Sequence, residues 1–530
     1  MSGERIKNDL GQYFTPQPVA AAMVGLLEAG LDELVLEPSA GQGVFLSALE
    51  AAGFENVEGV EIDEQLQCGS RFPLHRTSFI SWQPHKEYKA IIGNPPYIRW
   101  KNLDAELQTE VKQHRLWGSL FNSLSDYLTI FIAKAVEHLE DGGELVFITP
   151  SFWMGTQHSG NLREWLLKQG SFSNLILFGE SEVFPKVSSA IIIFRFVKGQ
   201  HLNTIRRHTF IGGRRVREPV QFNDPEQFQM DEIPQFRLNK HWTIASAGEQ
   251  TTADELESAC LGSASDTLFS STKIARLGDY VQIANGMVSG MDKAFRLPDD
   301  LLPKLSNNEV SALMPVVKAH NLTQIKPQRI TYYADVPSGL TEDEFKSTYP
   351  NIANHLELFR GHLEMRYSYG RHLPHWEWAF RRSERFLRSP IRKGFVPCKE
   401  RLTNRRAVRF ALVDETVVAT QDMTAFAPLP NVRESIEYIV GYLCLPKVSD
   451  WVRLRGLMKG GVAEFSERPL ADIPFRFIDW NNPTDVDLHN SVTHTVRCAW
   501  HDGNVESAIQ ELEHLFCTTS QRPIPASIRD

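Results

Sequence analysis

Apolar runs alternate with segments of helical periodicity along the first 200 residues of the chain. Short apolar runs that end in turns predict buried strands, and they lie at residues 57–63, 88–93, 144–149, 174–178 and 189–197. A further strand, a glycine turn and a helix start are predicted over 35–46. Helices are predicted at 18–29 and 124–140. This alternation is typical of an α/β fold, here a doubly wound Rossmann-like sheet.

The pattern changes after residue 200, and we divide the chain there. Residues 201–272 are polar, with a stretch rich in Ser and Thr, and we interpret them as a connecting segment between a first domain, 1–200, and a second, 273–530. The second domain is predicted to be α+β. It has a strand and glycine turn over 283–290, strands at 408–413 and 416–420, and a helix at 505–516.

Composition places the chain among ordinary globular proteins. It has 530 residues, 42% of them hydrophobic, which is enough for two or three cores. The sequence has no secretion signal and no window of about 18 uninterrupted apolar residues, so we expect a cytoplasmic protein that does not enter a membrane. The six cysteines form no Cys-x-x-Cys pair. We therefore expect reduced cysteines, with no disulfide framework and no metal site.

The charge is distributed unevenly. The net charge is −9, but residues 361–410 hold 13 Lys and Arg against four Asp and Glu, interleaved with aromatic residues. Arginine suits bidentate contacts to phosphate and guanine. This block is therefore predicted to bind nucleic acid, and a structural arginine network is the alternative. The candidate DNA-binding residues are Arg381, Arg382, Arg385, Arg388, Arg392, Arg405 and Arg406.

The tetrapeptide Asn94-Pro95-Pro96-Tyr97 follows the predicted strand 88–93. In open α/β sheets the chemistry lies at strand ends. The prolines remove two backbone donors, so the carbonyls there can face a ligand, and the Asn94 side chain adds another acceptor. Two acceptors suit an amino group on a ring, and Tyr97 offers a flat surface for stacking. The sequence therefore predicts a site for a nucleobase amine, with a plain turn as the alternative.

A second candidate site lies upstream. Gly41 and Gly43 follow the first predicted strand and precede a helix start, where backbone N–H groups and the helix dipole face a ligand. About two dozen residues further on, the strand 57–63 ends in an acid, where a carboxylate can accept both ribose hydroxyls. This spacing predicts the nucleoside-binding half of a doubly wound sheet.

Five motifs in order resemble the gamma-class, TaqI-like DNA adenine methyltransferases. They are Gly11-Gln12-Tyr13-Phe14-Thr15-Pro16, Leu36-Glu37-Pro38-Ser39-Ala40-Gly41-Gln42-Gly43, Gly59-Val60-Glu61-Ile62-Asp63, Gly93-Asn94-Pro95-Pro96-Tyr97 and Glu182-Val183-Phe184-Pro185. The resemblance is close over residues 1–200. It implies transfer of a methyl group from S-adenosylmethionine to the exocyclic amine of an adenine flipped out of double-stranded DNA, and a C-terminal target-recognition domain.

The resemblance also implies residue roles. The cofactor would be held by Thr15, Glu37, Pro38, Ala40, Gly41, Gly43, Glu61, Ile62, Ser78, Phe79 and Asn94. The flipped base would be held by Asn94, Pro95, Pro96, Tyr97 and Phe184. The runs 174–178 and 189–197 are expected to pair as a hairpin whose loop brings Phe184 beside Asn94, and a core Phe is the alternative. Where relatives carry an Asp that contacts the cofactor's adenine, this chain has Ser78, which brings no charge.

Three other functions remain open at this point. A protein glutamine methyltransferase can share the tetrapeptide but has no use for a basic, aromatic second domain. An RNA adenine methyltransferase would use the same basic and aromatic residues. A specificity subunit of a restriction or defence complex would bind DNA without catalysis. We expect a monomer that works with restriction or defence partner proteins.

Overall fold

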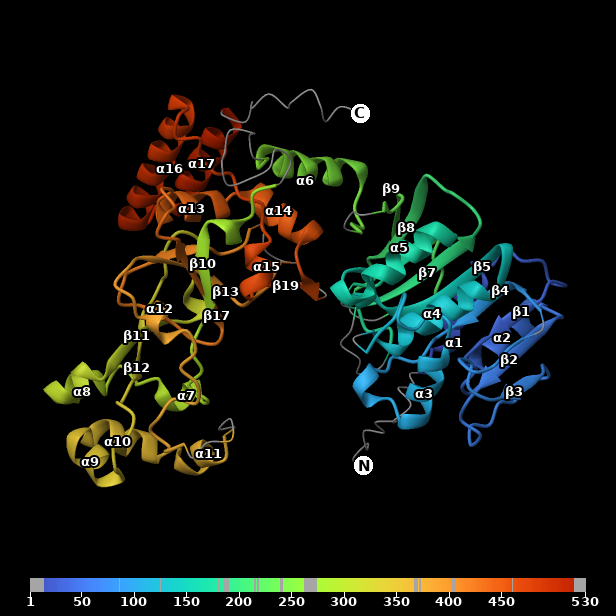
Figure 1. Cartoon of the computed structure of the whole chain (residues 1–530), viewed down its shortest axis with the longest axis horizontal. Coiled ribbons are helices and arrows are strands. Elements are labelled where there is room, and N and C mark those ends of the chain that lie inside the picture. The colour runs from blue at the N-terminus through green and yellow to red at the C-terminus, as the bar shows by residue number, and fades with distance from the viewer. Residues whose placement is uncertain are drawn as a thin grey trace. The chain divides into compact units, whose positions relative to one another are not determined.

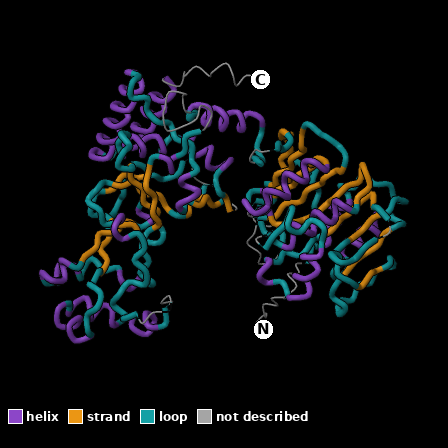
Figure 2. The backbone as a smooth tube through the Cα atoms, in the orientation of Figure 1, coloured by secondary structure: helices purple, strands orange, loops and turns teal. Residues whose placement is uncertain are grey.

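The computed structural model describes residues 14–518, except 85, 124, 180, 185–189, 214–215, 217–218, 239–241, 262–273, 367–369, 371–372, 403–406 and 460. The chain folds into two compact units, residues 1–250 and 251–530. Figures 1 and 2 show the elements of each unit. We describe each unit by itself.

The first unit is built on one nine-stranded mixed sheet in the order β3-β2-β1-β4-β5-β7-β6-β8-β9. Its strands are β1 Val35–Glu37, β2 Val57–Glu61, β3 Leu74–Arg76, β4 Tyr88–Gly93, β5 Leu139–Pro150, β6 Gly170–Leu177, β7 Ile191–Lys198, β8 Thr204–Phe210 and β9 Phe228–Pro234. Its helices are α1 Gln17–Val24, α2 Val44–Ala52, α3 Ala105–Gln113, α4 Tyr127–Glu137 and α5 Gly160–Gln169, and α6 Ala247–Ala259 crosses the boundary between the units.

Helices cover both faces of this sheet, which explains why its central strands are apolar at successive positions. In β4, Ile91 belongs to the core that includes α4 and α5, while Ile92 belongs to the core that includes α1 and α2. Because side chains alternate between the two faces of a strand, both faces need apolar residues. The predicted doubly wound α/β class is confirmed.

The strands β1 to β5 run parallel, and β7 enters antiparallel between β5 and β6. The pairing of β6 with β7 confirms the predicted hairpin. The observed helix α4 is shorter than the predicted helix 124–140, because it ends at Glu137 and β5 begins two residues later. The Gly142-Gly143 pair lies inside β5 at a shift in its register with β4.

The predicted connecting segment 201–272 is wrong for its first part. The strands β8 and β9 lie in this segment and extend the nine-stranded sheet, with β8 paired parallel to β6. The compact unit therefore ends at Gln250 instead of residue 200. β9 is the edge strand and β8 lies next to it. In both strands polar residues alternate with apolar ones, and such strands resemble irregular polar sequence. Residues 262–273 lie outside the described part of the chain.

The second unit contains three small sheets and a group of C-terminal helices. The sheets have the orders β10-β17-β13-β15, β12-β11-β16 and β14-β19-β18. Its strands are β10 Val281–Asn285, β11 Leu313–Val317, β12 Thr331–Ala334, β13 Lys393–Pro397, β14 Lys399–Arg401, β15 Ala411–Val413, β16 Val418–Ala419, β17 Met423–Pro428, β18 Met458–Lys459 and β19 Val462–Glu464. The predicted strands within 283–290, 408–413 and 416–420 are confirmed by β10, β15 and β16, each of which overlaps its predicted range.

The helices of the second unit are α7 Asp292–Phe295, α8 Asn307–Ser311, α9 Glu342–Thr348, α10 Pro350–Glu357, α11 Arg360–Glu364, α12 Glu384–Leu387, α13 Ile436–Leu443, α14 Pro446–Arg455, α15 Glu467–Ala471, α16 Pro483–Asp502 and α17 Val505–Thr518. One core packs α13, α14, α16 and α17 together, and the other lies under β11, β12, α9 and α10. The predicted terminal helix is α17, and the α+β class holds for this unit.

A buried ion pair joins the loop after α1 to the sheet. Arg195 of β7 donates from Nε to Oε2 of Glu144 in β5 at 2.5 Å, and the other Glu144 oxygen accepts the N–H groups of Glu28 and Ala29, each at 2.7 Å. Both side chains are almost fully buried. Removing one partner of such a pair leaves a buried charge without compensation.

We therefore predict that Arg195→Met lowers the free energy of unfolding of the first unit by about 3 to 5 kcal/mol. The matched control is Arg71→Met, which breaks the exposed pair of Arg71 with Glu50 and should cost less than about 1 kcal/mol. Urea denaturation followed by circular dichroism measures both. Equal losses for the two variants would contradict the structural role of the buried pair.

Candidate active site

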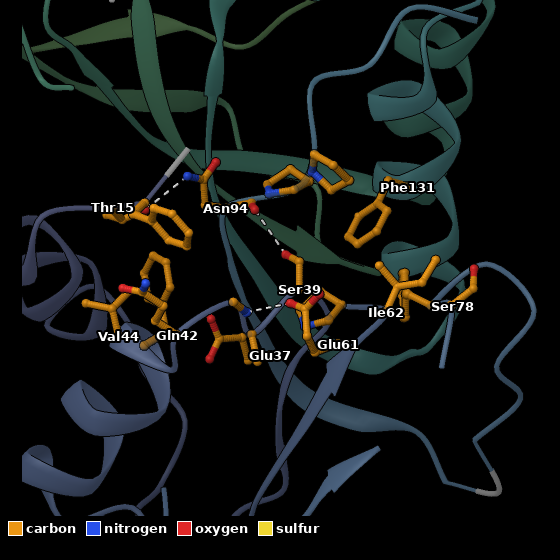
Figure 3. A pocket seen from close by; sticks show the side chains of 18 of the residues that line it. Thr15, Glu37, Ser39, Gln42, Val44, Glu61, Ile62, Ser78, Asn94 and Phe131 are labelled. Atoms are coloured by element: carbon orange, nitrogen blue, oxygen red, sulfur yellow. Dashed lines mark hydrogen bonds between the residues drawn. The ribbon is translucent and has the colours of Figure 1, made fainter. Parts of the chain in front are cut away.

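A cavity lies where three neighbouring parallel strands, β2, β1 and β4, end at the same edge of the sheet. Its volume is about 1020 Å³, including space open to solvent at its mouth. It is lined by Phe14, Thr15, Glu37, Pro38, Ser39, Ala40, Gly41, Gln42, Val44, Phe45, Glu61, Ile62, Ser78, Phe79, Asn94, Pro95, Pro96, Ile98, Leu107, Tyr127 and Phe131. Figure 3 shows this cavity from close by.

The structure brings most of the predicted cofactor residues together. Of those named from the sequence, all but Gly43 line the cavity. Gly43 is the residue before α2 and has a φ of 81°, which a residue with a side chain rarely adopts. A Cβ atom there would also lie 2.3 Å from Sγ of Cys68. Gly43 therefore shapes the turn that carries Gly41, whose φ is 55°, to the cavity wall.

Glu61 lies at the end of β2 with its carboxylate fixed by the backbone. Gly41 donates its N–H to Oε2 at 2.6 Å, and Asp63 donates its N–H to Oε1 at 2.8 Å. A carboxylate has about four acceptor positions, so each oxygen can accept one more hydrogen bond. The side chain is thus oriented to accept two neighbouring hydroxyl groups of a ligand.

Glu37 lies beneath the turn and is almost completely buried. Its Oε2 accepts the N–H of Leu46 at 3.1 Å, which ties β1 to α2. Burial raises the pKa of the Glu37 carboxyl well above its usual value, and the hydrogen bond from Leu46 partly opposes this. Glu37 therefore lines the cavity and, through its hydrogen bond with Leu46, also holds α2 against β1.

The Asn94 side chain is held in one orientation. Its Nδ2 donates to Oγ1 of Thr15 at 3.0 Å, while the Tyr97 hydroxyl contacts Oδ1 (Figure 3 shows the bond to Thr15). Ser39 donates from Oγ to the Asn94 backbone carbonyl at 3.0 Å. Pro95 and Pro96 follow in the cavity wall. The site therefore presents an amide beside two prolines, as the sequence predicted.

Tyr97 differs from the expected arrangement. Its ring is not among the residues that line the cavity, and its hydroxyl lies 2.8 Å from the carbonyl oxygen of Ile148. In this arrangement Tyr97 orients Asn94. Its predicted stacking on a base stays a prediction.

Phe184 is 2% exposed and belongs to the apolar core on the α1 and α2 face of the sheet. It does not line the cavity. The alternative of a core Phe agrees with this burial, and the predicted base contact stays a prediction.

Several lining residues were missed by sequence reasoning. Tyr127 and Phe131 are one helical turn apart on α4, and both line the cavity. Their i, i+4 spacing was visible in the sequence, but it indicated only an amphipathic helix. Phe14, from the Gly11–Pro16 motif, lies 3.8 Å from the position a Cβ would take at Gly41.

The basic block of the second unit is largely engaged within the protein. Arg381 and Arg388 both pair with Asp335, and both pair with Glu384. Arg392 pairs with Glu437.

The remaining members of the block differ from one another. Arg382 donates from Nε to the Gly286 carbonyl at 2.7 Å, whereas Arg385 is exposed. Trp376 and Trp378 are core residues. Arg405 and Arg406 lie outside the described residues. The structural network thus accounts for Arg381, Arg388 and Arg392, and DNA binding by the block stays a prediction.

Within the described ranges, no helix has the length and hydropathy needed to cross a membrane. Within the same ranges, no group of three or more His, Cys, Asp or Glu side chains is arranged to hold a metal ion.

Comparisons with known proteins show the family of the chain. The family model described as Eco57I restriction-modification methylase matches residues 44–184. The type II methyltransferase M.HindII of Haemophilus influenzae is 38% identical over 498 residues, 93% of this chain and 94% of the relative. M.HincII, also of Haemophilus influenzae, is 37% identical over 495 residues, with the same shares of the two chains.

The fold is shared with a solved structure. The type IIL restriction-modification enzyme MmeI, solved in complex with DNA, is similar with a TM-score of 0.59 and 11% identity, covering 95% of this chain and 71% of that chain. The fold and site define a methyltransferase of the α/β class. The chain belongs to the family of type II methyltransferases of restriction-modification systems. The gamma-class assignment stays a prediction.

We predict that Glu61→Gln weakens binding of S-adenosylmethionine, the cofactor that the sequence resemblance implies, by about 1.5 to 3 kcal/mol, because it removes the charge from the hydrogen bonds to a ribose. Isothermal titration calorimetry measures the affinity. The matched control is Glu58→Gln, on the same strand, whose side chain accepts from Tyr88 and does not line the cavity. Unchanged affinity in Glu61→Gln would refute the ribose contact.

Proposed function

We propose that this protein transfers a methyl group from S-adenosylmethionine to the exocyclic amine of adenine in double-stranded DNA. The observation that carries the proposal is the placement of Asn94 and Pro95 in the wall of a cavity that also holds the glycine turn and Glu61. Groups that can accept hydrogen bonds from hydroxyls and groups that can accept them from an amine therefore line the same cavity. A nucleoside cofactor and a second base fit this pair of sites.

The mechanism follows from the orientation of Asn94. An exocyclic amine is a weak nucleophile, because its lone pair is delocalised into the ring. Hydrogen bonds from its two protons to Asn94 Oδ1 and the Pro95 carbonyl would keep the lone pair on nitrogen and stabilise the positive charge that develops there. The bond from Asn94 Nδ2 to Thr15 and the contact with Tyr97 keep Oδ1 in place.

S-adenosylmethionine, when bound, supplies an activated methyl group on its sulfonium. The residues of the chain contribute orientation, which can offset about 7 to 11 kcal/mol of a barrier. They also hold the base outside the duplex, where unstacking costs a few kcal/mol. We infer that the second unit provides the DNA contacts and that the natural partner is a restriction nuclease with the same recognition sequence.

We predict that Asn94→Ala abolishes methyl transfer while leaving the affinity for S-adenosylmethionine within about twofold. The reason is that Oδ1 is assigned to the target amine, while the other ten residues implied to hold the cofactor are unchanged. Incorporation of a labelled methyl group into duplex DNA measures transfer, and calorimetry measures affinity. Asn56→Ala is the control, since Asn56 bonds Asp32 away from the cavity. Full activity in Asn94→Ala would refute the mechanism. If the unsubstituted protein methylates RNA alone, the RNA methyltransferase is favoured. If it methylates neither nucleic acid, the specificity subunit is favoured.

The arginine block gives a further prediction. Arg385→Ala should lower the salt slope of duplex binding by about 0.9, uniformly across sequences, if Arg385 contacts a phosphate. Arg388→Ala should instead lower the thermal stability of the second unit, because it removes a partner of Asp335. Titrations at several salt concentrations and thermal denaturation separate the two effects. An unchanged slope in both Arg385→Ala and Arg382→Ala would place the DNA-binding surface elsewhere.

A further inference from the structure

One side of α4 contacts the turn formed by residues 78–82. Tyr127, Phe131 and Lys134 occupy this side at positions i, i+4 and i+7, which lie on one face of a helix. The Tyr127 phenol interacts with the Ser78 side chain, and both residues line the cavity. The Phe131 ring lies 4.7 Å from the Phe79 ring. The helix therefore contacts the turn through these two residues, in addition to Lys134.

Lys134 fixes the end of the turn. It is 1% exposed, and its Nζ donates to the carbonyls of Ile80 at 2.5 Å and Trp82 at 2.6 Å. Burial lowers the pKa of Lys134 to about 8, an effect that Glu137 and Glu110 oppose. Such a buried cation needs these carbonyls as partners. The lysine is thus a positioning residue that sets where Ser78 and Phe79 stand in the cavity wall.

This end of the cavity is an apolar slot with two hydroxyl groups. Figure 3 shows Phe131, Ile62 and Ser78 gathered on one side of the cavity, away from Thr15 and Val44, with Glu61 between the two sides. Tyr127 also lines the cavity. A ligand whose ribose reaches Glu61 can therefore place a flat ring in this slot.

We propose that Ser78 and Tyr127 form a neutral hydroxyl pair that binds the purine edge of the nucleoside cofactor and takes the place of a carboxylate. The inference rests on the proposed use of a nucleoside cofactor. Two hydroxyls carry two protons, and only one proton can lie between the two oxygens. The second hydroxyl can rotate toward the cavity, while the oxygens keep lone pairs for an amine. Burial raises the pKa of the Tyr127 phenol, so it stays protonated at neutral pH.

The hydroxyl pair and a carboxylate differ in the purine groups to which they can hydrogen-bond. A carboxylate accepts from the 6-amino group of adenine but repels a 6-oxo group. A hydroxyl can donate to a 6-oxo group after rotating. The pair should therefore tolerate replacement of adenine by hypoxanthine, which a carboxylate at position 78 should reject.

Calorimetry with two small ligands tests this without DNA. The probes are S-adenosylhomocysteine and its 6-oxo analogue S-inosylhomocysteine. The protein should bind them within about tenfold of each other, because either protonation pattern can be matched. Ser78→Asp should widen this ratio to about 100-fold or more, because a fixed acceptor faces the 6-oxo group. Tyr127→Phe should weaken S-adenosylhomocysteine by about tenfold.

The control is Tyr88→Phe, which removes another buried phenol hydroxyl, bonded to Glu58 and outside the cavity; it should leave both affinities unchanged. If the unsubstituted protein bound S-adenosylhomocysteine more than 100-fold more tightly than S-inosylhomocysteine, the proposal would be overturned, and that measurement needs no variant. Unchanged affinity in a folded Tyr127→Phe protein would overturn it as well. The outcome is independent of the target base: methylation of cytosine would refute the proposed target and leave these ratios as predicted. Failure to bind S-adenosylhomocysteine would instead refute the cofactor.

Discussion

The parallel register of β2, β1 and β4 is the constraint on which the site depends. In this register Val35 of β1 is opposite Val57 on one side and Ala90 on the other. The glycine turn, Glu61 and Asn94 follow the ends of these strands, so all three reach the same edge of the sheet. A slip of one strand by a residue would reverse its side chains and turn Glu61 or the residues before Asn94 away from the cavity.

The groups at this edge are further fixed by bonds within the protein. Gly41 orients the Glu61 carboxylate, Thr15 orients the Asn94 amide, and Lys134 holds the turn with Ser78. Each of these bonds joins elements far apart in the sequence. Such preorganisation is what electrostatic stabilisation of a reacting group requires, because groups already in place need no reorientation during the reaction.

The sequence was sufficient for the sheet's centre and insufficient for its edge and for the arginines. Glycines, prolines and acids at strand ends carry their own local signal, so the lining residues of these types could be named in advance, whereas Tyr127 and Phe131 on α4 could not. The last two strands of the sheet, β8 and β9, are half polar and gave no such signal. Arg381 and Arg392 looked available because their partners Asp335 and Glu437 lie about 45 residues away in the chain, where local charge counting does not reach. The burial of Phe184 and the turning of Tyr97 toward Asn94 also depend on tertiary packing.

The central claim is that Asn94 and Pro95 receive an adenine amine. Long-read sequencing of DNA from cells that express the protein tests this most directly, because it reports both the modified base and its sequence context. The account predicts N6-methyladenine at a single recognition sequence in these cells, and no modification in cells that express Asn94→Ala. Methylated cytosine at that sequence, or adenine methylation that persists in Asn94→Ala, would contradict it.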